Sequence, residues 1–280
     1  MELKNKLKQT LKNSIRLNIG GSADLRTGAT RFGGKPDLPE SFVWPYFEGE
    51  NFNEGVKYRP LSFMAQFNLE ELAKYDTEKL LPEKGLLSFF YDIDTMRWGY
   101  DPKDEGCAKV YYFGDTDGLA AAEFPDDLNE DFRLPAFGIK LRSENSYQDY
   151  ADFLLQKDKM TECWDDYDRA ARSLKINIPE TSSKLLGWPD IIQDNMTMEC
   201  ELVSRGYYLG GDWEEVTPRD RQEAEQSSLK EWQLLFQLDT LWEDDFELMF
   251  GDCGRIYYYI RKEDLAAGNF DKVWLIMQCC

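Results

Sequence analysis

One alternating segment of the chain occurs twice, and this repetition constrains the fold more than any other feature. Residues 61–68 carry apolar side chains at every second position, and residues 232–239 repeat the pattern. Gln237 and Asp239 stand in the second copy where Gln66 and Asn68 stand in the first. Successive side chains of a strand point to opposite faces, so each copy predicts a strand with one apolar face. The pair predicts a duplicated β unit.

The elements that follow each copy also occur in the same order. Asn68 with Glu71 three residues later is typical of a helix N-cap, and Asp239 with the following residues 240–243 has the same offset. A strand led by glycine comes next, at 85–91 and again at 254–260, and then a Lys-Val strand at 109–113 and 272–277. We therefore expect a β-rich α+β fold: an internally duplicated antiparallel sheet unit (strand, capped helix, two strands) with a pseudo-twofold relation and peripheral helices.

The pattern predicts one fused domain over residues 1–280. Leu3, Leu7, Leu11 and Ile15 recur every four residues, which predicts an N-terminal helix at 2–18. Repeat one covers about 31–140, a helical insertion about 145–180, and repeat two about 184–280. Thr217 and Pro218 open another short helix as cap and first residue. The 8 Trp, 15 Tyr and 17 Phe favour half-buried sheet surfaces.

Charge and composition exclude several classes of function. The net charge of −20 argues against nucleic acid as a partner, because binding phosphate groups requires a basic face. The chain has no histidine, which removes histidine-dependent nucleophilic catalysis and imidazole metal sites. Fragments such as Asp115-Thr116-Asp117-Gly118 lack the downstream glutamate of a calcium loop. We expect no cofactor and no metal, and any chemistry would depend on carboxylates, Lys, Tyr or Cys.

Cysteine usage and hydropathy indicate the compartment. The six cysteines show no C-x-x-C spacing and predict reduced thiols. No apolar run approaches the roughly 20 residues that a membrane-spanning helix needs. We therefore predict a cytoplasmic protein with no membrane partner.

Several blocks resemble a known family. They are Gly33-Gly34-Lys35-Pro36, Trp98-Gly99-Tyr100-Asp101-Pro102, Leu185-Leu186-Gly187-Trp188-Pro189-Asp190 and Gly251-Asp252-Cys253-Gly254-Arg255. Together with the ending at 271–279, they resemble the YwqG-like family, a bacterial domain-of-unknown-function family. The resemblance runs from about residue 30 to the last residue. It implies a duplicated β-rich fold and a cytoplasmic bacterial protein, and it implies no established reaction.

Six residues are candidates for a binding site. Gln66 and Gln237 offer amide donors and an acceptor at related positions, although each could instead satisfy a backbone group beside its own strand. Asp252 lies between glycines in a probable turn, and Arg255 could pair with it. Trp98 and Asp101 join an aromatic surface to a carboxylate, which suits carbohydrate or peptide recognition and equally suits a packed loop. We predict no catalytic residue.

Two functions remain open from the sequence. The acidic charge and the aromatic-rich sheet favour a non-enzymatic interaction protein, immunity-type or regulatory, that caps a basic protein partner. The alternative is a protein that binds a small polar ligand or carbohydrate, with a carboxylate-based hydrolase as its enzymatic form. The oligomeric state does not follow from the sequence.

Overall fold

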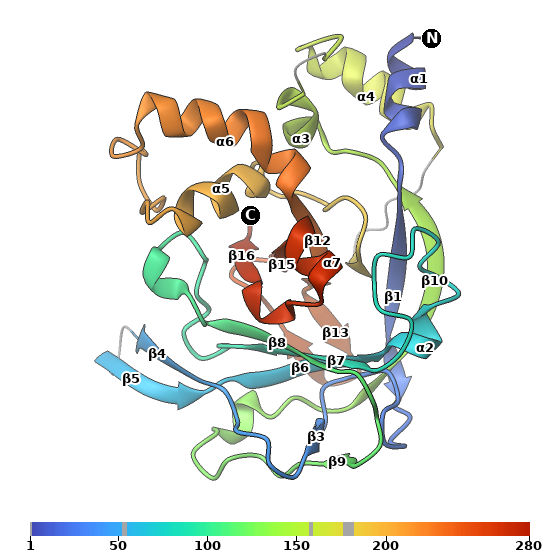
Figure 1. Cartoon of the computed structure of the whole chain (residues 1–280), viewed down its shortest axis with the longest axis vertical. Coiled ribbons are helices and arrows are strands. Elements are labelled where there is room, and N and C mark those ends of the chain that lie inside the picture. The colour runs from blue at the N-terminus through green and yellow to red at the C-terminus, as the bar shows by residue number, and fades with distance from the viewer. Residues whose placement is uncertain (1, 52–54, 157–158, 176–181) are drawn as a thin grey trace.

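A ten-stranded antiparallel sheet organises the described part of the chain (Figure 1). The computed structural model describes residues 2–51, 55–156, 159–175 and 182–280. The strand order across the sheet is β16-β15-β12-β11-β1-β10-β2-β6-β7-β8. The strands are β1 Lys12–Ser22, β2 Arg31–Phe32, β6 Ser62–Asn68, β7 Leu86–Tyr91, β8 Ala108–Phe113, β10 Phe137–Ser146, β11 Ser183–Leu185, β12 Trp232–Asp239, β15 Arg255–Arg261 and β16 Trp274–Gln278.

The strand order is the same from the middle of the sheet to either edge. Outward from the central β1–β10 pair, one side runs β2, β6, β7, β8 and the other runs β11, β12, β15, β16. The strand pairs β6–β7 and β12–β15 share an irregularity, because the register shifts between Phe63 and Ala65 in one and between Leu234 and Phe236 in the other. These matched features are consistent with the expected pseudo-twofold relation, and the duplication itself stays a prediction.

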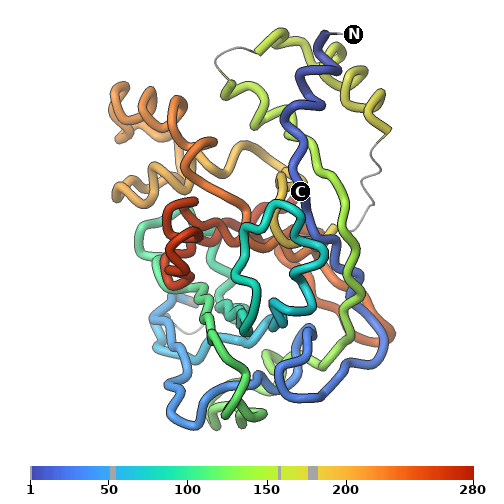
Figure 2. Tube along the Cα trace, turned by 45° about the vertical axis from the view of Figure 1, so that its right-hand side comes forward, coloured from blue at the N-terminus to red at the C-terminus, as the bar shows by residue number. Residues whose placement is uncertain are grey.

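The central pair crosses between the two halves. β1 precedes β2 in the chain but pairs with β11, and β10 precedes β11 but pairs with β2. β1 and β10 pair with each other from Lys12–Ser146 to Ser22–Phe137, and they run side by side in Figure 2. β1 therefore borders the half of the sheet that contains β11, and β10 borders the half that contains β2.

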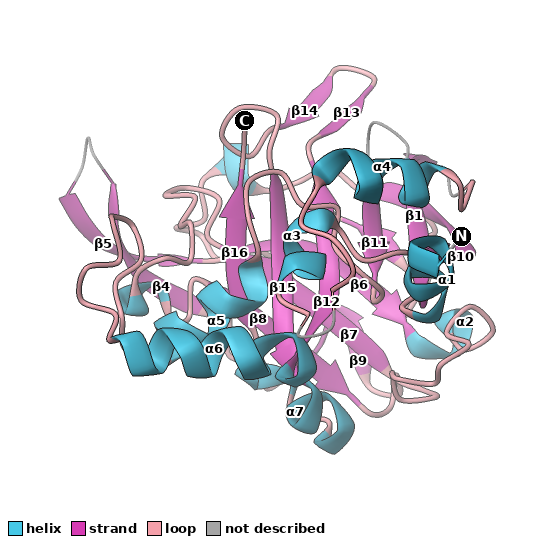
Figure 3. Ribbon diagram, turned by 90° about the horizontal axis from the view of Figure 1, so that it is seen from above, coloured by secondary structure: helices cyan, strands magenta, loops and turns pink. Residues whose placement is uncertain are grey.

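Three two-stranded sheets and seven α-helices surround the main sheet in the described residues. The small sheets pair β3 Asp37–Pro39 with β9 Leu119–Ala121, β4 Tyr46–Asn51 with β5 Gly55–Pro60, and β13 Leu241–Glu243 with β14 Phe246–Leu248. The helices are α1 Glu2–Gln9, α2 Leu69–Leu72, α3 Tyr150–Leu154, α4 Trp164–Arg172, α5 Met196–Ser204, α6 Pro218–Glu231 and α7 Lys262–Ala267. Figure 3 shows α5 beside α6, with α1, α3 and α4 elsewhere on the molecule. No helix in the described ranges is both long and apolar enough to cross a bilayer.

The main core lies where the two halves of the curved sheet face each other. The ring centroids of Phe89 and Phe236 are 4.9 Å apart, and Tyr258 packs on both rings. The Tyr258 hydroxyl donates to the Phe90 carbonyl across the halves at 3.2 Å. A second apolar cluster lies under α5 and α6, and a third joins α1, α3 and α4. The apolar face of the first copy lies in this main core, together with Phe236 and Leu238 of the second copy. Trp232 and Leu234, on the other side of the register shift in β12, lie in the second cluster.

Two predicted helices are wrong. The helix expected at 2–18 ends at Gln9, and β1 begins at Lys12. Ile15, Leu17 and Ile19 alternate with period two, and β1 pairs with two neighbouring strands. This strand pattern takes precedence over the helical spacing of four residues, which also includes Ile15. The helix expected after Asp239 is the β13–β14 hairpin, which turns at Asp244 with a φ of 51°.

The first helix cap is confirmed, and other elements differ mainly in their bounds. Asn68 accepts hydrogen bonds from the backbone N–H groups of Glu70 and Glu71 at the start of α2. Thr217 caps α6 with Pro218 as its first residue, and this helix is longer than expected, at 14 residues. The last strand begins at Trp274, after a 3₁₀ turn at Phe270–Lys272. α3 and α4 supply the helices expected at 145–180, of which 157–158 and 176–181 lie outside the described residues.

Candidate functional site

The amide of Gln66 is used inside the protein. Its side chain is fully buried on β6, and its Oε1 accepts from the Asp37 backbone N–H at 2.9 Å. Its Nε2 donates to the Ala29 carbonyl at 2.9 Å and to the Asp37 carboxylate at 2.6 Å. Arg31, opposite Gln66 in the β2–β6 ladder, completes the group with an ion pair to Asp37 at 2.8 Å. The Gln66 amide thereby links β6 to the segments on either side of β2.

Gln237 has the same set of partners in the other half. Its Oε1 accepts from the Asp190 backbone N–H at 2.9 Å, and its Nε2 donates to the Ser182 carbonyl and, at 3.0 Å, to the Asp190 carboxylate. Lys184, opposite Gln237 in the β11–β12 ladder, forms an ion pair with Asp190 at 2.7 Å. The two glutamines therefore make equivalent contacts in separate places, and they do not meet in one site.

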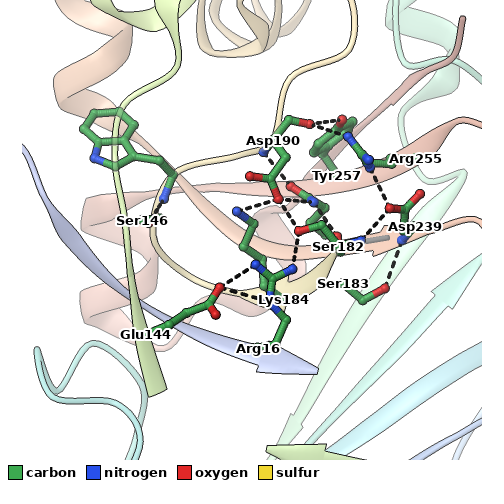
Figure 4. A network of polar contacts seen from close by, with 12 residues as sticks. Arg16, Glu144, Ser146, Ser182, Ser183, Lys184, Asp190, Asp239, Arg255 and Tyr257 are labelled. Carbon is green, nitrogen blue, oxygen red and sulfur yellow. Dashed lines mark hydrogen bonds and ion pairs between the residues drawn. The ribbon is translucent and has the colours of Figure 1, made fainter. Parts of the chain in front are cut away.

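The group around Gln237 belongs to a larger charged network. Arg16 on β1 pairs with Glu144 on β10 at 2.5 Å, and Arg255 on β15 pairs with Asp239 on β12 at 2.9 Å. With Lys184 and Asp190, three ion pairs connect the central β1–β10 pair to the half of the sheet that contains β11, β12 and β15 (Figure 4). The exposed Arg142 also pairs with Glu144 at 3.0 Å, and each buried charge has a partner of opposite sign, as buried charges generally do.

Burial and the ion pair with Asp190 have opposite effects on the pKa of Lys184. The side chain is 1% exposed, and burial lowers the pKa of its ammonium group although the Asp190 carboxylate opposes the change. The pKa of Asp190 is also lowered: burial acts to raise it, and it is outweighed by Lys184, Ser182 and Gln237, which all stabilise the carboxylate. The Asp190 carboxylate is the more exposed partner of the ion pair with Lys184. The network as a whole holds β11 and β12 together.

Asp252 and Arg255 do not form a pair with each other in any contact that the structure shows. Asp252 lies in an exposed turn, where its backbone carbonyl accepts from the Cys280 N–H at 3.1 Å. Arg255 points to the network, where its Nη1 donates to the Asp190 carbonyl at 3.1 Å in addition to its ion pair with Asp239. Of the six candidates, Gln66, Gln237 and Arg255 therefore contribute contacts inside the protein.

Trp98 and Asp101 line an open pocket. We call it the aromatic–acidic pocket, and its volume is about 380 Å³. Trp98 is 39% exposed and Tyr208 is 54% exposed, whereas Tyr100, which also lines the pocket, is partly buried. The lining residues are Glu50, Thr95, Met96, Arg97, Trp98, Tyr100, Asp101, Asp104, Tyr208 and Gly210.

The pocket wall is anchored to the edge of the main sheet. The Trp98 carbonyl accepts from the Met277 N–H on β16 at 2.9 Å, and the Gly99 carbonyl accepts from the Trp274 indole at 2.9 Å. Gly99 has a φ of +82°, and a Cβ there would lie 1.8 Å from the Leu275 carbonyl oxygen. Only glycine allows the wall to approach β16 this closely, and this contact fixes Trp98 at the pocket rim.

Carboxylates give the pocket its charge. Asp101 caps the following 3₁₀ turn by accepting from the Lys103 N–H at 2.9 Å. Asp104 accepts from the Gly99 N–H at 3.0 Å, and burial raises the pKa of its carboxyl group. Arg97 lies 3.8 Å from Asp104 and donates to the Glu50 carbonyl at 2.6 Å. Three carboxylates and one guanidinium line this pocket, so its formal charge is negative.

Sequence reasoning identified two of the lining residues and missed the rest. Tyr208 and Glu50 come from segments more than 40 residues away from Trp98. The Leu209 N–H donates to the Tyr100 carbonyl at 2.7 Å, which brings Tyr208 to the pocket. No pattern in the local sequence predicts this contact between distant segments. No group of three or more acidic or cysteine side chains suited to a metal ion occurs among the residues that the structure describes.

Comparison with known proteins identifies the family of the chain. The model of a domain of unknown function, DUF1963, matches residues 30–279. The chain therefore belongs to the DUF1963 family, whose matched region includes the whole aromatic–acidic pocket and both glutamines. No curated protein sequence matches the chain.

Proposed function

We propose that this DUF1963 protein is a non-enzymatic binding protein whose partner inserts a basic side chain into the aromatic–acidic pocket. The observation that carries the proposal is the placement of two exposed aromatic rings beside carboxylates in one open pocket. A cation over an aromatic face gains about 0.5–1 kcal/mol at exposed sites and more when it is desolvated. Carboxylates at the same pocket add a charged hydrogen-bond acceptor.

The size and charge of the surroundings support a lysine or arginine side chain. A volume of about 380 Å³ falls at the small end of ligand pockets and accepts one long side chain. The net charge of −20 raises the local concentration of a basic partner and accelerates its association at low salt. Binding of this kind suits an immunity-type or regulatory role in which a basic protein is capped.

A peptide array tests the proposal. Wild-type protein should retain peptides that contain lysine or arginine and lose them as the salt concentration rises, because screening weakens charge attraction. Trp98→Ala should reduce retention about two- to fivefold, the factor that corresponds to about 0.5–1 kcal/mol. Asp101→Asn keeps a capping oxygen for the Lys103 N–H but removes the charge, so it should weaken binding without loosening the turn. Retention that is equal for basic and neutral peptides contradicts the proposal.

A neutral oligosaccharide is the second candidate ligand. An exposed tryptophan beside polar oxygen acceptors can stack on a sugar ring and bind its hydroxyl groups, and Trp98 with Asp101 offers this combination. The two candidates differ in their salt dependence, since binding of an uncharged sugar would not weaken as ionic strength rises. A glycan array probed at low and high salt therefore separates them.

A further inference from the structure

Three helices form a cap with a small core of its own. We call α1, α3 and α4 the helical cap. Their buried contacts join Leu7, Phe153, Tyr167 and Ala171, and this cluster is separate from the two clusters of the sheet and of α5. Figure 1 shows the three helices together at one end of the molecule. A small satellite core provides little apolar burial, so the cap belongs to the part of the structure that opens most easily.

A buried carboxyl group joins the cap to the body. Asp152 of α3 is 1% exposed, and its Oδ1 accepts from the Asn195 side-chain N–H. Asn195 is itself the N-cap of α5, because its Oδ1 accepts from the Met198 N–H at 2.8 Å. The contact therefore couples the seating of α3 to the first turn of α5.

The second oxygen of Asp152 is left without a partner. Its Oδ2 has no hydrogen-bond partner among the described residues, and the buried Tyr259 hydroxyl also has none. An ionised carboxylate with an orphan oxygen would lose its hydration without replacement, which costs far more than burying a neutral carboxyl. The contacts of the closed cap thus suit the protonated form of Asp152.

The groups around Asp152 come from every neighbouring element. Asp149 lies at the start of α3, Asp194 and Asn195 precede α5, Lys12 begins β1, and Tyr259 lies on β15. Burial, followed by the negative charge of Asp149, raises the pKa of Asp152 to about 7, whereas Asn195 and Lys12 act in the opposite direction. Burial lowers the pKa of Lys12 to about 8, so this lysine keeps its charge below that pH.

We propose that Asp152 is a proton-operated latch between the helical cap and the sheet body. Its neutral carboxyl group holds α3 against the N-terminus of α5. Loss of the proton favours a state in which the cap has lifted and the carboxylate has reached water. The cap responds to pH mainly through this buried group, with a smaller contribution in the same direction from Asp149, and independently of any ligand in the aromatic–acidic pocket.

The direction and the pH window follow from linkage. In the open state Asp152 is in water and titrates near the ordinary value of 3.8, and in the closed state its pKa is about 7. The closed state is therefore most favoured below pH 4. Between these values the opening equilibrium constant rises about tenfold per pH unit, and above pH 7 it is constant because both states are ionised.

Hydrogen exchange on the full chain measures the opening. Protection factors of amides in α1 and α3, corrected for the intrinsic exchange rate, should fall about tenfold per pH unit from pH 4.5 to 6.5 and then level off. Amides of β12 should not follow this course. Asp152→Asn carries a neutral isostere, so its cap protection should keep only the weaker pH dependence of Asp149, whose pKa burial also raises.

Two further variants keep the test informative if Asp152→Asn does not fold. Asp149→Asn retains the capping oxygen that accepts from the Ala151 N–H but removes the nearby charge, so the levelling point should move to lower pH. Glu199→Gln removes another buried acid outside the cap and should leave the cap transition unchanged. Wild-type cap protection that does not vary with pH, or the same slope in Asp152→Asn, overturns the proposal.

Discussion

At the scale of single residues, the two matched glutamines illustrate how much of a buried site the sequence can predict. The repeat predicts that Gln66 and Gln237 occupy related positions on polar strand faces, and the structure gives them equivalent partners. Their partners lie in the turns at Asp37 and Asp190, and no alternation pattern encodes which backbone group an amide will reach. The residue type was thus predictable as a hydrogen-bonding position, but its burial and partners depend on the tertiary structure.

Loss of either amide should destabilise the fold. Gln237→Leu leaves the Asp190 N–H and the Ser182 carbonyl without their partner, and an unsatisfied buried polar group costs about 1–3 kcal/mol. Gln66→Leu should cost a similar amount for the same reason. Denaturant unfolding measures both, and Gln222→Leu on the exposed face of α6 is the control, expected within about 0.5 kcal/mol of wild type. An equal effect of all three changes contradicts this account.

At the scale of elements, strands were more predictable than what connects them. The strands at 85–91, 109–113 and 254–260 follow from their apolar runs and leading glycines, and the cap at Asn68 follows from its local spacing. Asp239 occupies the corresponding position but accepts from the Ser182 N–H and pairs with Arg255. Its carboxylate is therefore not available to cap a helix, and the sequence offers no local sign of these distant partners.

The different roles of Asn68 and Asp239 predict different costs of truncation. Asn68→Ala removes a helix cap, which costs about 0.5–2 kcal/mol. Asp239→Ala leaves the half-buried Arg255 guanidinium without its carboxylate, and loss of one member of a fully buried ion pair costs about 3–5 kcal/mol, which is the upper limit here. Unfolding free energies from denaturant titration compare the two variants. An Asp239→Ala cost no larger than that of Asn68→Ala would contradict a stabilising role for the Asp239–Arg255 ion pair.

The turn before Asp190 offers a test of backbone geometry. Gly187 has a φ of +74°, and a Cβ there would lie 2.4 Å from Ser146 Oγ and 2.7 Å from Ser14 Cβ. Gly206 also has a positive φ, of +97°, but a Cβ there would meet no atom within 4 Å. Gly206→Ala should therefore cost only about 1–2 kcal/mol for the left-handed conformation. Gly187→Ala should lower the thermal midpoint further, because the turn must also move away from β1 and β10.

At the scale of the whole molecule, the match to a domain-of-unknown-function family and the β-rich fold agree with the expectations from the sequence, and the YwqG-like label stays a prediction. Of the residues that line the aromatic–acidic pocket, the sequence predicted only two. Trp98 and Asp101 lie within one short motif, and Tyr208 and Glu50 join them only through folding. The curved sheet brings β16 to the loop that carries Trp98, so the pocket depends on pairing across the entire chain.

The stability of the whole molecule should depend on Glu199. This glutamate of α5 is buried, its Oε2 has no partner among the described residues, and burial raises its pKa to about 8 from the ordinary 4.5. Between these values the unfolded chain is ionised while the folded protein retains the proton, so stability falls as pH rises from about 4.5 to 8. Glu199→Gln should reduce this slope, which urea unfolding at pH 5, 6.5 and 8.5 measures. An unchanged slope contradicts the assignment.

The central claim is that the aromatic–acidic pocket binds a basic side chain, and NMR titration of the Trp98 indole N–H tests it most directly. Argininamide should shift this resonance in a saturable manner, and the effect should weaken as salt is added. Norleucinamide has a comparable aliphatic chain without the side-chain charge and should produce no saturable shift. Asp101→Asn should weaken the argininamide response without abolishing it. An indole resonance that is unmoved by argininamide, or moved equally by both amides, would contradict the claim.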